Sequence, residues 1–286
     1  MTIAIAVQIH DGIVFASDSA STLSTTDADG KATIVNVYNN ANKIFNIRKG
    51  YPIGGMTYGV GNFGTASIST LAKDLRHRFT GNDPDFLGWK LDQDSFTIEQ
   101  VATQARIFLY EEKYKPLGLK GAGSVFGFMV GGYSAKAALS ELWEIKIVDG
   151  ECAAPVRLLA QGAASAYASG DPEAFMRIAL GHGSKLGAAL LKIGLKPENT
   201  EKAIADIRAE LAETLVEASM PIADAIDLAE FFVHATCLFT RFKRGAATVG
   251  GPIESAAITK HEGFKWVKRK HYFDDILNPQ ERDNVA

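Results

Sequence analysis

The sequence predicts an α+β fold in which two antiparallel sheets are flanked by layers of helices. Its predicted elements come in clusters: strands, two helices, more strands, more helices and a closing strand pair. A doubly wound parallel sheet would instead need strands and helices in regular alternation. We see no internal repeat, and a chain of 286 residues is long enough for one large domain or two small ones.

The first two strands are predicted as a hairpin. Residues 3–9 alternate along their length, a His10-Asp11-Gly12 turn follows, and residues 13–16 form a second apolar run. Two such runs around a short glycine-containing turn are typical of a β-hairpin. The hairpin would place Thr2, at the start of the first strand, beside Asp18, at the end of the second.

Thr2 is therefore a candidate nucleophile. A hydroxyl at the chain terminus beside a buried carboxylate is an N-terminal nucleophile arrangement. If Met1 is removed, the free α-amine, with an ordinary pKa of about 7.7–8.0, can act as the general base for its own hydroxyl. Threonine is a common second residue, so this position alone also allows a purely structural Thr2.

The next segments are predicted as a loop, a projecting hairpin strand and an apolar strand. Residues 19–31 are rich in Ser, Thr and Asp, which favours a loop, and residues 32–38 are β-branched and alternating. Lys43 opens the apolar strand of residues 43–47. Its ammonium needs either water, as a solvated lysine at a strand edge, or a carboxylate partner.

A glycine-rich turn joins the strand at residues 51–58 to an amphipathic helix at residues 65–79. The turn, residues 59–64, reads GVGNFG, which has the GxGxxG spacing of a dinucleotide-binding turn. We reject that function, because a dinucleotide site needs a second parallel strand directly after the helix. A Gly/Asp/Pro-rich loop at residues 81–94 follows instead. Free N–H groups at such a turn can bind an oxyanion.

The remaining elements follow from periodicity and from end signals. Helices are predicted at residues 98–115, with a capping box at Thr97-Ile98-Glu99-Gln100, and at 174–191, 199–218 and 223–242. Strands are predicted at residues 124–133, 141–148 and 157–161, with a closing pair within 248–259. A small-residue turn is predicted at 162–165, and a basic tail, solvated or in contact with another subunit, at 260–286.

Composition narrows the class of protein. The chain is 47% hydrophobic with a net charge of −3, which describes an ordinary soluble protein and argues against general nucleic-acid binding. It has no apolar run of about eighteen residues, so we expect no membrane span, and it lacks the features of a signal peptide. Cys152 and Cys237 are predicted to be buried free thiols in a reducing cytoplasm. No cluster has metal-ligand spacing, so neither a metal nor a cofactor is expected.

Four pieces of the sequence together resemble the proteasome β-subunit family of N-terminal nucleophile (Ntn) hydrolases, and most of all its bacterial homologues. Residues 11–19, DGIVFASDS, resemble the family's DGVVLAADS at the same distance from the nucleophile. Asn42-Lys43-Ile44-Phe45 is similar to the KI(F/H) element, and residues 56–67 to the strand–Gly–helix unit. Residues 162–170 resemble GSGSxYAxG. The likeness covers about the first 180 residues in order, and the chain to about residue 259 more loosely.

The resemblance implies a four-layer αββα Ntn-hydrolase sandwich over residues 1–259, with residues 260–286 as a basic extension. It also implies roles for particular residues. These are Thr2 as nucleophile, Asp18 and Lys43 as the catalytic pair, Gly59 as the oxyanion-hole N–H, and Ser165 and Ser19 as supporting hydroxyls.

The activity implied is that of a threonine endopeptidase in the cytoplasm, working without a cofactor on peptide or unfolded protein. The resemblance further implies a homo-oligomeric ring or double ring that encloses its sites, and it leaves an unfoldase partner open. Exposure of Thr2 would depend on methionine aminopeptidase, which removes Met1 before small residues.

Three departures from the family pattern keep two other functions open. The loop between Asp18 and Lys43 is longer, Ala163 stands where the family has a serine, and residues 248–253 replace a readable Asp-x-x-Ser-Gly motif. A non-catalytic ring or scaffold subunit is one alternative, and it would retain Met1. An Ntn hydrolase acting on small amides is the other, favoured by a narrow site or a monomeric state.

Overall fold

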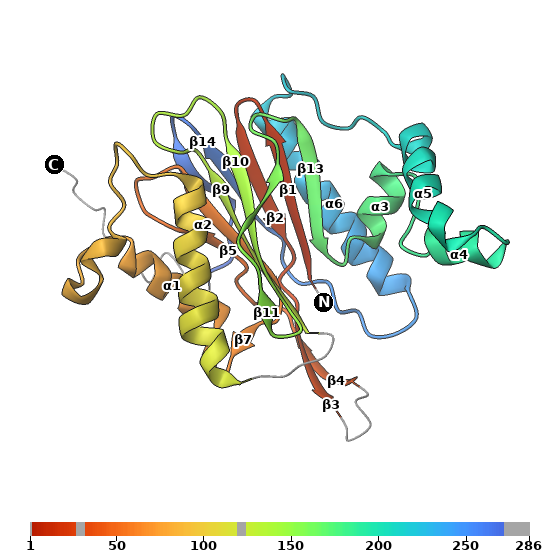
Figure 1. Ribbon diagram of the computed structural model, residues 1–286, viewed down its shortest axis with the longest axis horizontal. Coiled ribbons are helices and arrows are strands. Elements are labelled where there is room, and N and C mark those ends of the chain that lie inside the picture. Colours follow the sequence, from red (N-terminus) through yellow and green to blue (C-terminus); the bar gives the residue numbers. More distant parts are fainter. Residues whose placement is uncertain (1, 27–31, 119–123, 272–286) are drawn as a thin grey trace.

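The computed structural model describes residues 2–26, 32–118 and 124–271. Two sheets lie face to face, and helices cover their outer sides (Figure 1). Every strand pairing is antiparallel, as the clustered element order predicts.

The first sheet contains both ends of the described chain. Its strands, in spatial order, are β13 (Ser165–Gly170), β1 (Ile3–Ile9), β2 (Gly12–Ser17), β14 (Glu254–Thr259) and β15 (Gly263–Lys268). The β1–β2 hairpin confirms the predicted pairing, with Ala4 opposite Ser17. Strand β13 was not predicted: the sequence indicates a turn followed by a helix there. Its Ser- and Ala-rich residues have weak strand propensity and become a strand by pairing with β1.

The second sheet lies against the first. Its strands are β11 (Glu151–Cys152), β10 (Glu141–Val148), β9 (Val125–Gly132), β6 (Ile53–Gly59) and β5 (Ile44–Asn46), and β12 (Val156–Leu159) also pairs with β10. Two short ladders stand apart: β3 (Ser21–Thr26) with β4 (Ala32–Tyr38), and β7 (Asn62–Phe63) with β8 (Ala66–Ser67). The projecting hairpin is confirmed, but the predicted loop at 19–31 is already strand β3 from residue 21; residues 27–31 lie outside the described residues.

Helices form the outer layers. They are α1 (Ile68–Arg78), α2 (Ile98–Arg106), α3 (Glu173–Ala179), α4 (Leu186–Lys192), α5 (Pro197–Leu211) and α6 (Ile222–Phe242). A π-helix, Ile107–Tyr114, continues α2, and short 3₁₀ helices lie at Pro84–Trp89 and Lys115–Leu117. Thr97 caps α2 as predicted, because its hydroxyl accepts the Gln100 N–H at 3.0 Å.

One predicted helix is interrupted. Residues 174–191 form α3 and α4 with a break between them, not a single helix. Gly181, in the break, has φ of +71°, and a Cβ at this position would lie 2.4 Å from Leu211 Cβ. The left-handed backbone ends α3 here. Gly181 and Gly183 are the sequence signal for this break, which the prediction of one continuous helix overlooked.

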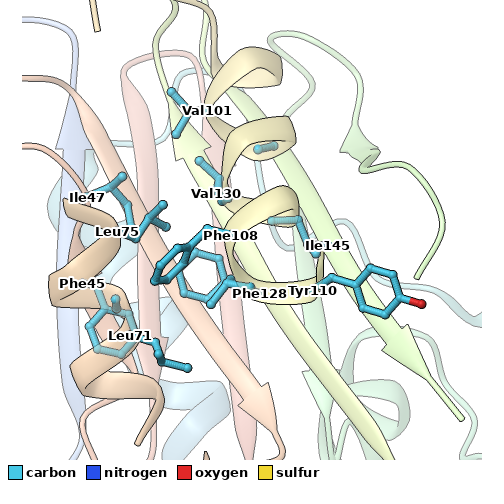
Figure 2. Packing of buried hydrophobic residues seen from close by; sticks show 14 of the residues in the cluster. Phe45, Ile47, Leu71, Leu75, Val101, Phe108, Tyr110, Phe128, Val130 and Ile145 are labelled. Atoms are coloured by element: carbon cyan, nitrogen blue, oxygen red, sulfur yellow. The ribbon is translucent and has the colours of Figure 1, made fainter. Parts of the chain in front are cut away.

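Three apolar clusters hold the layers together. One lies between α1, α2 and the second sheet, where Phe108 and Leu75 pack towards Phe128 and Phe45 (Figure 2). A second fills the space between the sheets and includes Phe15. The third lies between the first sheet and helices α3 and α6. The resulting order of helices, sheet, sheet and helices is consistent with the predicted sandwich.

The C-terminal segment belongs to the first sheet as far as residue 268, which is further along the chain than the sequence predicts. The closing pair is β14 with β15, not a pair within residues 248–259, and Phe264 of β15 joins the cluster between the sheets. A boundary at residue 259 therefore divides this hairpin. Residues 272–286 lie outside the described residues. Within the described part of the chain, no helix has the length and apolar character to span a membrane.

Candidate functional site

Asp18 is the centre of the candidate site. It follows β2 directly, is fully buried, and accepts four hydrogen bonds. Its Oδ1 takes the Ile3 N–H at 3.0 Å and Lys43 Nζ at 2.7 Å. Its Oδ2 takes the N–H groups of Ala20 and Gly250, each at 3.0 Å. A buried carboxylate is stable only when it is paired and hydrogen-bonded in this way.

Lys43 is the buried partner of that carboxylate, not a solvated lysine at a strand edge. Only 6% of its side chain is exposed. Its carbonyl accepts the Thr57 N–H of β6 at 2.9 Å, which places it in line with β5 at the edge of the second sheet. Burial lowers the pKa of Lys43, and the contact with Asp18 acts in the opposite direction. The pair therefore bridges the two sheets with a desolvated ammonium.

Thr2 lies at the start of β1, and it is buried. The sheet ladder continues past the strand end, because Thr2 O accepts the Asp171 N–H at 2.7 Å. Ala4 and Ala6 face the space between the sheets, whereas Ile3 and Ile5 face the helices. Strand alternation assigns Thr2 to the same face as Ala4. Asp18 reaches this strand end through the N–H of Ile3, the residue that follows Thr2.

Gly59 ends β6 two residues after Thr57, the residue that pairs with Lys43. It has φ of +84°, and a Cβ would lie 2.0 Å from Val125 O. Glycine is needed here because the left-handed backbone and the close approach of β9 leave no space for a side chain. The expected oxyanion-hole N–H thus belongs to β6, the strand whose Thr57 N–H donates to the Lys43 carbonyl.

Ser165 does not lie near Thr2. In the β1–β13 ladder it pairs with Gln8, at the far end of the strand, whereas Gly170 pairs with Ile3. Five residues of strand, roughly 17 Å, separate the two ends. The resemblance of residues 162–170 to the family's turn implied that Ser165 supports the nucleophile. Residues 165–170 are instead strand β13, which places Ser165 at the opposite end of β1 from Thr2.

The residues nearest Thr2 in this ladder are Ser169 of β13 and Asp171, directly after it, and both are buried. Ser169 pairs with Ala4, and Asp171 donates its N–H to Thr2 O. Sequence reasoning missed both residues. No alternation of apolar and polar residues marks this strand, and Tyr167 is the residue in it with a clear strand preference.

Ser19 lies behind Asp18, away from β1. Its Oγ donates to Pro252 O at 2.6 Å and accepts from Lys270 Nζ at 2.7 Å. Ala163 offers no side-chain hydroxyl; its carbonyl accepts from the Gln8 amide, and its N–H donates to Ala160 O. In place of the family's Asp-x-x-Ser-Gly motif, residues 248–253 supply the Gly250 N–H to Asp18.

A cavity of about 440 Å³ lies beside this loop, lined by α6, β4 and residues 247–253. Cys237 of α6 lines it, and burial, with the nearby Asp18 carboxylate, raises the pKa of this thiol to about 11. The thiol is therefore protonated at neutral pH and unsuited to act as a nucleophile. Among the described residues, no group of His, Cys, Asp and Glu could hold a metal ion.

The comparisons with known proteins do not identify a family for this chain. No protein-family model matches the chain, and no curated protein matches it. Among solved structures, a similar chain is that of the Anbu (Gly-1) mutant from Hyphomicrobium sp. strain MC1. It is 16% identical, with a TM-score of 0.49, over 97% of this chain and 90% of that one.

Proposed function

We propose that the chain is a proteasome-like Ntn hydrolase, a threonine peptidase that acts through Thr2 once Met1 is removed. One observation supports this more than any other. The buried Asp18 carboxylate joins the Ile3 N–H, directly after Thr2, to the Lys43 ammonium. A purely structural ion pair would need no such link to the first residues of the chain.

In the proposed reaction Thr2 Oγ attacks the carbonyl carbon of a peptide bond and its proton passes to the Thr2 α-amine. The carbonyl electron pair moves onto oxygen, where the Gly59 N–H would stabilise it by about 3 kcal/mol. The C–N bond then breaks, and the leaving amine takes the proton from the α-ammonium. Water hydrolyses the resulting ester and restores Thr2.

Lys43 would act through its charge. A cation beside the hydroxyl lowers the effective pKa of that hydroxyl and favours the transition state in which negative charge develops. Desolvation strengthens this effect, because the interaction of charges rises as the local dielectric falls. Asp18 keeps the ammonium in place without exposing it to water.

The substrate would be peptide or unfolded protein, cleaved inside a ring or double ring of identical chains, with an unfoldase partner left open. Two alternatives on the same fold remain. Small-amide hydrolysis would fit a monomer. A non-catalytic ring subunit is favoured by Ala163 in place of the family's serine and by the lack of a readable Asp-x-x-Ser-Gly motif at residues 248–253.

The test of this proposal is the intact mass of the native protein, with and without a threonine-directed epoxyketone or β-lactone. We expect a mass without Met1, and a single adduct that is absent in Thr2→Ala. Thr25→Ala, which removes an exposed hydroxyl of β3, is the matched control and should react like the native chain. If Met1 is retained and no fraction forms an adduct, the peptidase proposal is wrong and the non-catalytic scaffold function remains.

Sedimentation of the same sample separates the remaining alternatives. A reactive ring supports the peptidase, whereas a reactive monomer supports a small-amide hydrolase.

A further inference from the structure

A second buried ion pair lies directly behind the first. Lys270 Nζ is 2.6 Å from Glu254 Oε2, and their side chains are 13% and 3% exposed. Glu254 begins β14, and Lys270 follows the end of β15. Two charges removed from water at such cost imply a role that a surface pair could not serve.

The Lys270 ammonium also bonds to two residues that flank the candidate catalytic pair. It donates to Ser19 Oγ at 2.7 Å and to Ala41 O at 2.9 Å. The ammonium therefore makes two hydrogen bonds and one ion pair, the latter with Glu254. Ser19 directly follows Asp18 in sequence, and Ala41 lies two residues before Lys43.

The same contacts include the segment that supplies another donor to Asp18. Ser19 N donates to Gly250 O at 2.9 Å, and Ser19 Oγ donates to Pro252 O at 2.6 Å. Ala41 N donates to Ser19 O at 2.9 Å. The ammonium thus contacts the Ser19 and Ala41 segments directly, and Ser19 links the Gly250 segment to them. Each of these three segments holds part of the Asp18–Lys43 pair.

We propose that Lys270 is a positioning residue of the candidate site, whose ammonium fixes the Ser19 and Ala41 segments directly and the Gly250 segment through Ser19. This inference rests on the proposed function for its catalytic meaning. Lys270 takes no part in bond making, because its ammonium is held within the protein by Ser19, Ala41 and Glu254. Nor do Ser19 and Lys270 form a second nucleophile, since Ser19 is fully buried and closed to substrate.

The charge of Lys270 acts on Lys43 as well. The charged and titratable groups that face Lys43 are Asp18 at the end of β2, Cys237 on α6 and Lys270. After burial, repulsion by Lys270 also lowers the pKa of Lys43. Removing the Lys270 charge alone should therefore raise the pKa of Lys43, whereas removing the negative charge of Glu254 at the same time acts in the opposite direction.

The variant for the test is the double substitution Lys270→Met with Glu254→Gln. Removing Lys270 alone would leave Glu254 as an unpaired buried carboxylate and could unfold the chain. Lys270→Arg retains the charge. Lys268→Met is the matched control. Lys268 lies two residues before Lys270 and also pairs with a carboxylate, that of Glu230, but its side chain is 59% exposed.

The first measurement is the rate at which a β-lactone modifies Thr2, followed against pH. We expect the double variant to react about ten- to a hundredfold more slowly, because small displacements of catalytic groups have effects of this size. The ammonium form of Lys43 is the active one, so reactivity falls as pH rises through its pKa. Because the double variant loses one charge of each sign, this alkaline limb should move little, and the loss of rate should appear across the pH range. Lys268→Met should match the native protein, and Lys270→Arg should recover part of the rate.

The second measurement does not depend on activity. The Lys43 signal is followed by NMR in protein labelled at the lysine Cε, with Lys43→Arg to assign it. A displaced Lys43 Cε signal in the double variant, with a native signal in Lys268→Met, supports the inference, even if native Thr2 proves unreactive and the peptidase proposal fails. A native Lys43 Cε signal in a folded double variant shows that Lys43 has not moved and overturns it, whatever the lactone does.

Discussion

Asp18 shows how a single residue connects parts of the chain that are distant in sequence. Its two oxygens accept from β1, from the segment after β2, from Lys43 and from Gly250. The sequence predicts its closeness to the start of β1, because a hairpin register follows from local alternation and turn length. The Gly250 contact could not be predicted, because more than two hundred residues separate the partners and only packing of β14 beside β2 brings them together.

Replacing Asp18 by Asn tests how much the Asp18 carboxylate contributes to the stability of the fold. The amide nitrogen would face N–H donors or Lys43, and the buried ammonium would lose its counter-charge. We expect a loss of about 3–5 kcal/mol in the free energy of unfolding, as is typical when one partner of a buried pair is removed. Urea unfolding measures it. Asp11→Asn, at a 74% exposed side chain, should change stability by less than about 0.5 kcal/mol; equal midpoints for the two variants would contradict this account.

Gly59 can be tested separately from its proposed oxyanion role. Gly59→Ala adds a Cβ at φ of +84° that would meet Val125 O at 2.0 Å. Gly50→Ala is the matched control, since Gly50 has φ of +81° with no atom within 4 Å of the added Cβ. We expect Gly50→Ala to cost about 1–2 kcal/mol from backbone strain alone, and Gly59→Ala to cost distinctly more in the same thermal unfolding assay. A cost for Gly59→Ala no greater than that for Gly50→Ala would show that β9 is free to move away.

At the level of elements, the segment between α3 and α4 depends on one carboxylate. Glu173 begins α3, and its Oε2 accepts the Ser184 N–H at 2.9 Å, while its Oε1 accepts from Arg177. The hydrogen bonds from Ser184 contribute most, and Arg177 adds to them; together they lower the pKa of Glu173 from 4.5 to about 2. The carboxylate thus fixes the turn that follows the break at Gly181.

Glu173→Gln should therefore reduce stability in a pH-dependent way. The folded-state pKa lies below the unfolded value, so the contribution is complete above about pH 4.5 and is lost as pH falls towards 2. The difference in unfolding free energy between native and variant chains should be constant from pH 7 to 5 and shrink below that, by about half near the middle of the window. A difference that does not depend on pH would show that the ionised form is not the one that holds the turn.

At the scale of the whole molecule, the sheet ends at β15 and not at residue 259. Phe264 and Trp266 of β15 pack against the cluster between the sheets, and β15 covers the free edge of β14. An uncovered, largely buried strand such as β14 would present unpaired backbone groups and promote aggregation.

Two truncated chains test this. A chain that ends at residue 259 should be insoluble or lack a cooperative unfolding transition, because it loses β15 and the Lys270 contacts. A chain that ends at residue 271 keeps both and should unfold cooperatively near the native temperature. Calorimetry of the soluble fractions measures this. Equal transitions for the two chains would mean that residues 1–259 form a complete folding unit.

Local patterns in the chain were sufficient to predict the elements whose cause is local. Alternation and a short turn predicted the β1–β2 hairpin, a Thr97 cap predicted the start of α2, and the clustered order of elements predicted two antiparallel sheets between helices. Long-range contacts, by contrast, make residues 165–170 a strand, place Ser169 and Asp171 rather than Ser165 near Thr2, and bring Lys270 to Ser19. Each of these depends on pairing or burial between segments far apart in the chain, where a weak local preference is overridden by contacts that no local pattern encodes.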